Sequence, residues 1–130
     1  MRVLDTDTCI EILRGNGVVI ARRESTPDDV GTTWVTASEL YFGAARSSAP
    51  GGNRDLVDRF LQTLSVIDFD LRAARVFSAT KAALRDAGQQ IADADLFIAS
   101  VVIARGATLV TGNRRHFERI PGIILEDWIR

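Results

Sequence analysis

The feature that most constrains this fold is the alternation of short apolar runs with longer segments of helical period. Apolar runs occur at residues 3–4, 66–67 and 109–110. Residues 53–64 instead place apolar side chains three and four positions apart, the pattern of a helix with one buried face. Strands separated by helices predict a parallel sheet with helices on both faces. We therefore expect an α/β fold.

The same reading along the chain gives the expected elements. Strands are expected at residues 3–4, 32–36, 66–67, 108–111 and 123–125. Helices are expected at residues 8–14, 18–24, 38–46, 53–64, 71–87 and 93–105, with Gly88 and Gly106 ending the last two. Residues 47–53 are the clearest break, but they are too short to link two halves that each build a core. We expect one domain over residues 1–130.

Composition limits the classes of function. Hydrophobic residues make up 46% of the chain, which is enough for a buried core. The net charge of −1 argues against broad electrostatic coating of a nucleic acid, although it leaves room for a local basic rim. Cys9 is the only cysteine, so no intramolecular disulfide forms. The first residues do not have the long apolar stretch of a signal peptide. We expect a cytoplasmic protein.

Four polar residues stand where a strand ends or a helix begins: Asp5, Glu39, Asp95 and Asn113. In parallel sheets, ligands bind beyond the carboxyl ends of the strands. Carboxylates gathered there resist ionising unless a cation compensates for their charge. Hard cations such as Mg²⁺ take oxygen ligands of this kind. The pattern therefore predicts a divalent-metal site suited to phosphate chemistry.

Asp5 and Glu39 also have structural interpretations. Aspartate is a favoured helix cap, although Asp7 and Thr8 are available for the same task next to Asp5. Glu39 follows Thr36 at the spacing of a capping box, and so it is also explained by a helix start. Either role would place these side chains without any metal.

Asp95 gives a stronger signal than the others. On helical spacing it shares a face with Ile98 and Val102, which look buried. A carboxylate on such a face is costly unless it is compensated, whereas Asp93 already suits the helix dipole. Asn113 offers a carbonyl oxygen to a metal or water, or is simply a residue of a turn.

Three further polar residues lie at or after the ends of expected strands. Thr111 is placed to hydrogen-bond a carboxylate or a water, or only ends a strand. Asp70 is expected to cap the helix that starts at residue 71. His116 is the only histidine, and one histidine without a cysteine cluster does not make a usual zinc site. We expect His116 in a loop near the mouth of the site.

Ordered segments carry a resemblance to a known family. They lie at residues 4–7, 37–43, 91–99, 108–113 and 117–122, and no single segment is specific. In their order and spacing they resemble the PIN-domain ribonucleases, specifically the VapC-type toxins of bacterial toxin–antitoxin pairs. The resemblance implies a three-layer α/β/α sandwich with a parallel central sheet, and hydrolysis of RNA by a metal-dependent mechanism.

The resemblance also implies roles for particular residues. Catalytic positions would be Asp5, Glu39, Asp95 and Asn113, of which Asp5, Asp95 and Glu39 would hold Mg²⁺ or Mn²⁺. Supporting positions would be Thr6, Asp93 and Thr111. The implied partners are RNA, a small VapB-type antitoxin and a second copy of the chain in a homodimer. The antitoxin would cover apolar surface on the first helices, for which Trp34, Tyr41 and Phe42 are available, although core packing also explains these side chains.

Two positions depart from the family pattern. The family often has asparagine where this chain has Asp7, and an acid where it has His116. With Asn113 also uncharged, a fourth carboxylate is absent and a second metal ion is expected to bind weakly or only with substrate. Arg14, Arg114 and Arg115 are candidates for RNA backbone contacts or plain solvated charges.

Two other functions compete with the nuclease. The first is a PIN-like module that dimerises or binds a partner without cutting RNA, which the neutral side chains near the site favour. The second is a phosphoacceptor signalling domain, which needs a lysine after a late strand. Lys81 instead lies within an expected helix, so this alternative is disfavoured.

Overall fold

The computed structural model describes all 130 residues. Its five strands form one parallel sheet in the order β3-β2-β1-β4-β5. The strands are β1 (Arg2–Leu4), β2 (Val30–Thr33), β3 (Ser65–Ile67), β4 (Thr108–Val110) and β5 (Leu125–Glu126). The helices are α1 (Thr6–Leu13), α2 (Gly17–Ser25), α3 (Trp34–Ala45), α4 (Pro50–Leu61), α5 (Leu71–Asp86), α6 (Asp93–Ala104) and α7 (Arg114–Phe117). The expected parallel sheet is confirmed.

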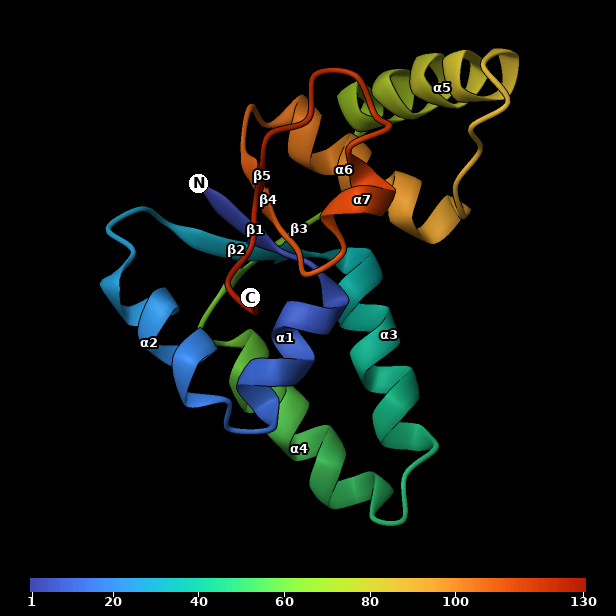
Figure 1. Cartoon of the computed structure of the whole chain (residues 1–130). Helices are drawn as coiled ribbons and strands as arrows, with labels where there is room; N and C mark the ends of the chain where they lie inside the picture. The colour runs from blue at the N-terminus through green and yellow to red at the C-terminus, as the bar shows by residue number, and fades with distance from the viewer.

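Helices cover both faces of the sheet because successive strand residues point to opposite faces. On β1, Val3 packs in one core cluster with Leu84 and Leu96 of α5 and α6. The next residue, Leu4, packs in a second cluster with Val19 and Leu40 of α2 and α3. Figure 1 shows α5, α6 and α7 on one side of the strands and α1 to α4 on the other. The three-layer α/β/α architecture is therefore confirmed.

Two expected boundaries were wrong around α3 and α4. Trp34 and Val35 begin α3 rather than continue β2. The change of direction occurs because the Thr33 hydroxyl accepts a hydrogen bond from the Thr36 amide at 3.3 Å and caps the helix. Helix α4 begins at Pro50, inside the expected loop. Proline suits this position because the backbone N–H that it lacks would have no hydrogen-bond partner in the first turn of a helix.

Other boundaries follow the sequence more closely. Asp70 caps α5 by accepting a hydrogen bond from the Ala73 amide at 2.9 Å, as expected. Gly88 and Gly106 follow the ends of α5 and α6 with φ of 67° and 63°, a backbone conformation that glycine adopts without strain. Strand β5 lies at 125–126 rather than 123–125, and α7 was not expected, because four residues are too few to show a helical period.

The register of β1 and β4 sets where the candidate site lies. Leu4 pairs with Val110, so the residues that follow each strand emerge side by side. The Asp5 amide still donates to the Val110 carbonyl at 3.0 Å, after which the chain turns into α1.

None of the helices combines the length and the apolar character that crossing a bilayer requires.

Candidate active site

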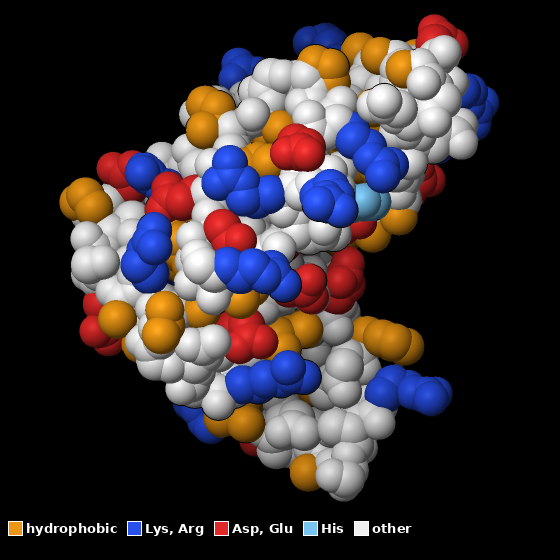
Figure 2. Space-filling view, viewed as in Figure 1, with side chains coloured by type: hydrophobic (Ala, Val, Ile, Leu, Met, Phe, Trp, Pro, Cys, Tyr) orange, Lys and Arg blue, Asp and Glu red, His pale blue; other side chains and the backbone are white.

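The four residues expected to form a site line one small cavity beyond the carboxyl ends of β1 and β4. Asp5 follows β1, Glu39 lies on α3, Asp95 lies in the first turn of α6, and Asn113 lies between β4 and α7. The cavity has a volume of about 80 Å³, and its full lining is Asp5, Thr6, Asp7, Glu39, Asp95, Ile98, Asn113 and Phe117. Figure 2 shows acidic side chains gathered where the surface is notched between the two helical layers.

Asp5 is the most buried acid of the cavity, with 5% of its surface exposed. Its Oδ1 accepts a hydrogen bond from the Thr8 amide at 2.9 Å, so Asp5 itself caps α1. Asp7 and Thr8, which were also available for this task, do not cap the helix. Burial raises the pKa of the Asp5 carboxyl, and the charge of Asp7 raises it further, while hydrogen bonds from Thr111 and Thr8 only partly offset the increase. A nearby cation would remove this penalty.

Glu39 approaches the cavity from α3. Its side chain is exposed and makes no hydrogen bond within the chain. The capping box expected between Thr36 and Glu39 is not formed, because Thr33 caps the helix instead. The Thr36 hydroxyl faces the Thr6 hydroxyl at 3.1 Å, which ties the start of α1 to α3 beside the cavity. Glu39 is thus a free carboxylate on a fixed helix.

Asp95 lies half-buried at the opposite wall. Its Oδ2 is 2.9 Å from His116 Nε2. Helix α6, which carries Asp95, has Ala92 as its N-cap and no side-chain hydrogen bond at this end, so the Asp95 carboxylate is not used for capping. His116 belongs to α7 rather than to a loop, and it reaches the site through its contact with Asp95, which lines the cavity.

Thr111 and Asn113 shape the remaining side. Thr111 is fully buried, and its hydroxyl accepts a hydrogen bond from the Asn113 amide at 2.9 Å. It also hydrogen-bonds the Asp5 side chain. Asn113 is exposed and makes no side-chain bond as it enters α7, so its amide group is available to a ligand. Asp93 points elsewhere, since its carboxylate pairs with Lys81 at 3.0 Å on a separate depression.

The donor set fits a divalent cation bound partly through water. No three carboxylate, imidazole or thiol groups stand close enough to hold an ion directly in this conformation. The cavity nevertheless gathers the carboxylates of Asp5, Asp7, Glu39 and Asp95 with the amide of Asn113. The shared cavity is the more informative observation, because Mg²⁺ usually keeps several waters and contacts only one or two carboxylates.

Sequence reasoning missed two contributors. Asp7 lines the cavity and affects Asp5 through its charge, but it was considered only as a cap and as a departure from the family pattern. The contact between His116 and Asp95 joins residues 21 positions apart, and a lone histidine in a short helix gives no pattern that would reveal it. The acid that the family often has at position 116 was the one available signal.

Comparison with known proteins agrees with this fold. The PIN domain family model matches residues 2–123. An α/β/α sandwich with an acidic cavity at the carboxyl ends of its strands is thus accompanied by a sequence match over nearly the whole chain. The chain belongs to the PIN-domain family.

The relatives define the group within that family. The chain is 37% identical to the tRNA(fMet)-specific endonuclease VapC of Salmonella typhimurium over 127 residues, covering 97% of this chain and 96% of the relative. It is 32% identical to ribonuclease VapC2 of Rickettsia felis, covering 97% and 96%. Its relatives are thus ribonucleases of the VapC type.

Solved structures of two such proteins superpose closely on the chain. One is DNA-bound VapBC from Salmonella typhimurium, with a TM-score of 0.93, 36% identity and coverage of 98% of this chain and 97% of that one. The other is VapBC2 from Rickettsia felis bound to a DNA fragment from its promoter, with a TM-score of 0.92, 31% identity and 98% coverage of both chains.

Proposed function

We propose that this chain is a metal-dependent endoribonuclease and the toxin of a toxin–antitoxin pair. The observation that carries the proposal is the buried Asp5, which shares one cavity with Glu39 and Asp95. The similarity to an endonuclease over 97% of the chain supports RNA as the substrate. Oxygen donors favour Mg²⁺ or Mn²⁺ as the ion.

The candidate catalytic side chains differ in whether hydrogen bonds within the chain fix their orientation. A bound divalent cation supplies a Lewis acid that lowers the pKa of a coordinated water and offsets charge on the scissile phosphate. Asp5 is fixed by the Thr8 amide, and Asp95 is fixed by His116, so both present preoriented oxygens. Glu39 has no partner and is free to turn toward the cavity. Asn113 offers an amide that orients water or a phosphate oxygen.

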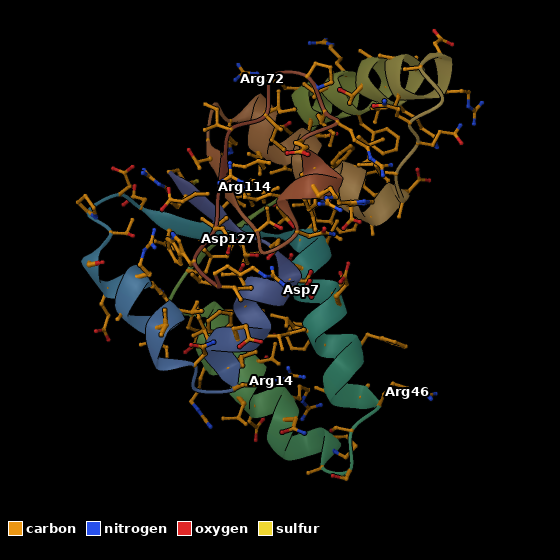
Figure 3. The ribbon with its side chains drawn as sticks, in the orientation of Figure 1. Asp7, Arg14, Arg46, Arg72, Arg114 and Asp127 are labelled. Carbon is orange, nitrogen blue, oxygen red and sulfur yellow. The ribbon has the colours of Figure 1, made fainter.

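Arginines beside the cavity supply contacts for the RNA backbone. A second depression of about 410 Å³ shares Asp7 and Asn113 with the cavity and also contains Arg14 and Arg130. In Figure 3, Asp7 lies between Arg14 and Arg114. Exposed guanidinium groups position a phosphate backbone without reading its sequence. The RNA strand therefore has a path that leads from the acidic cavity past Arg14.

A groove between α1, α3 and α4 suits the antitoxin. It has a volume of about 390 Å³ and is lined mainly by apolar side chains, including Leu13, Leu40 and Leu56, with Glu39 and Arg14 among its lining residues. An amphipathic antitoxin helix would bury its apolar face there, and a basic side chain at its end would reach Glu39. The VapBC complexes among the structural neighbours support this partner.

Of the aromatic side chains expected at a partner surface, only some are available. Phe42 is 68% exposed and Tyr41 36% exposed on α3. Trp34 instead packs against Phe69 and Phe97, with ring centroids 6.2 and 5.7 Å apart, in the core beside α5 and α6.

Formation of a homodimer and location in the cytoplasm complete the proposal. Light scattering of the purified chain tests whether it forms the homodimer.

The direct test is cleavage of defined RNAs. Purified protein is expected to cut RNA with Mg²⁺ or Mn²⁺ and to stop with EDTA; tRNA(fMet) is the first substrate to try, because a relative is named for it. Asp5→Asn and Asp95→Asn are each expected to lose activity while circular dichroism shows an unchanged fold. Undiminished cleavage in both variants would refute the mechanism. End-mapping of the products then identifies the cleaved bond.

A non-catalytic binding module is the second candidate function. The wide spacing of the acidic groups favours it, since no three of them hold an ion directly. Calorimetric titration with MnCl₂, run beside the cleavage assay, separates the two. Binding of Mn²⁺ together with cleavage supports the enzyme. If the chain shows neither Mn²⁺ binding nor cleavage but still forms a complex with the antitoxin, the binding module is supported.

A further inference from the structure

The only histidine of the chain touches one of the candidate metal ligands. His116 Nε2 lies 2.9 Å from Asp95 Oδ2, and the contact crosses from α7 to the first turn of α6. The two side chains are 25% and 36% exposed, so the contact is partly shielded from solvent. It joins the segment that follows β4 to the wall formed by α6.

The chemistry of the pair fixes where the hydrogen is. An ionised carboxylate only accepts hydrogen bonds, so Nε2 must carry the hydrogen and donate it to Oδ2. Oδ1 is then the oxygen of Asp95 that remains free for a cation or a coordinated water. His116 itself offers no lone pair toward the cavity through Nε2.

Nothing else in the chain holds the Asp95 carboxylate. The Asp93 carboxylate, two residues earlier, forms an ion pair with Lys81. The Asp5 carboxylate accepts a hydrogen bond from the Thr8 amide. Asp95 makes no other hydrogen bond or ion pair, and it does not cap α6. The orientation of this carboxylate therefore depends on His116. The His116 ring also packs edge-on against Phe117, at a centroid distance of 5.6 Å, which limits its own rotation.

We propose that His116 is a positioning residue that orients Asp95 for cation binding. The proposal rests on the metal-dependent function above and adds to it the residue that replaces the acid common at this position in the family. Hydrogen bonds from outside a metal site orient the ligating carboxylates, and their loss typically weakens metal binding about 10–100-fold. A histidine here thus contributes a donor rather than a further negative charge.

A pair of variants separates the donor from the shape of the side chain. His116→Gln keeps an N–H group near the Nε2 position, whereas His116→Leu fills space without a donor. With MnCl₂ as the probe in calorimetry, we expect His116→Leu to bind about 10–100-fold more weakly than the wild type and His116→Gln to recover most of that loss. Glu118→Gln, on an exposed residue at the end of α7, is the matched control and is expected to bind as the wild type does.

A second readout needs no metal. Because the tag-free chain has one histidine, its imidazole ¹⁵N spectrum at alkaline pH reports His116 alone. We expect the tautomer with hydrogen on Nε2, and we expect the signals to move in Asp95→Ala and again on adding Mg²⁺. If His116 had a merely structural role, both His116 variants would change the free energy of unfolding measured in urea. The two variants would then bind Mn²⁺ with the same affinity.

The outcomes are distinguishable. If the wild type binds Mn²⁺ and His116→Leu binds it equally well, the positioning role is wrong and the proposed function stands. If the wild type binds no divalent cation, the metal-dependent function fails and the positioning role fails with it. A spectrum dominated by hydrogen on Nδ1 also overturns the inference.

Discussion

Replacing Asp5 by asparagine should raise the stability of the metal-free protein while abolishing its response to metal. Burial raises the pKa of Asp5 above its ordinary value of 3.8. The folded state therefore binds the proton more tightly than the unfolded state does. As pH rises from the unfolded value through the higher folded value, the ionised side chain subtracts from stability, and the loss persists at neutral pH. Asparagine carries no charge and avoids this loss.

The magnitudes follow from the two tasks of the Asp5 side chain. Asparagine keeps an oxygen for the Thr8 amide, whereas Asp5→Ala removes the cap of α1, so we expect the alanine variant to be about 1 kcal/mol less stable than the asparagine variant. With a divalent cation at about 100 times its dissociation constant, the wild type should gain about 2.7 kcal/mol. Neither variant should show a comparable gain. Adding metal should therefore shift the stability difference between wild type and Asp5→Asn toward the wild type by about 2.7 kcal/mol.

Urea denaturation measures both effects. The three proteins would be unfolded at pH 7 in EDTA and again in MgCl₂, and the wild type and Asp5→Asn would also be compared between pH 4 and 7. In EDTA, the advantage of Asp5→Asn should grow as pH rises. If Asp5→Asn is instead less stable than the wild type in EDTA throughout this range, the charge of Asp5 is already compensated within the chain, and the reasoning for a cation fails.

Three further predictions concern packing and placement. Gly31→Ala should destabilise by about 1–3 kcal/mol in urea, because a Cβ there meets the Ser65 backbone oxygen at 2.8 Å; Gly43→Ala, with open space around it on α3, should stabilise by about 0.5–1 kcal/mol, and equal effects would contradict the β2–β3 packing. Burial raises the pKa of the Cys9 thiol to about 12, so a disulfide reagent at pH 8 should label it only after unfolding, and rapid native labelling would show that the site is open. Asp93→Asn should leave Mn²⁺ affinity unchanged in calorimetry, since its carboxylate pairs with a lysine on α5; a clear loss would return Asp93 to the site.

The sequence indicated which residues would meet, but not how each would be held. Alternating strands and helices predicted that Asp5 and Asn113 would lie at the carboxyl ends of strands, and the register of β1 with β4 places these two ends side by side. The caps were predicted less well. Thr33 competes with Thr36 for the start of α3, and the backbone turn after β2 decided between them. Local patterns offer several plausible caps, and only the chain path selects one.

By itself, the sequence determined the α/β class, the covering of both faces of the sheet, and the set of acidic positions beyond its strands. These follow from hydrophobic periodicity and from residue chemistry, which are local properties of the chain. Only the tertiary structure decided that Asp93 turns away to Lys81, that Asp7 adds its charge to the cavity, and that His116 holds Asp95. Such contacts depend on how separate helices pack against the sheet, and no spacing along the chain encodes that geometry.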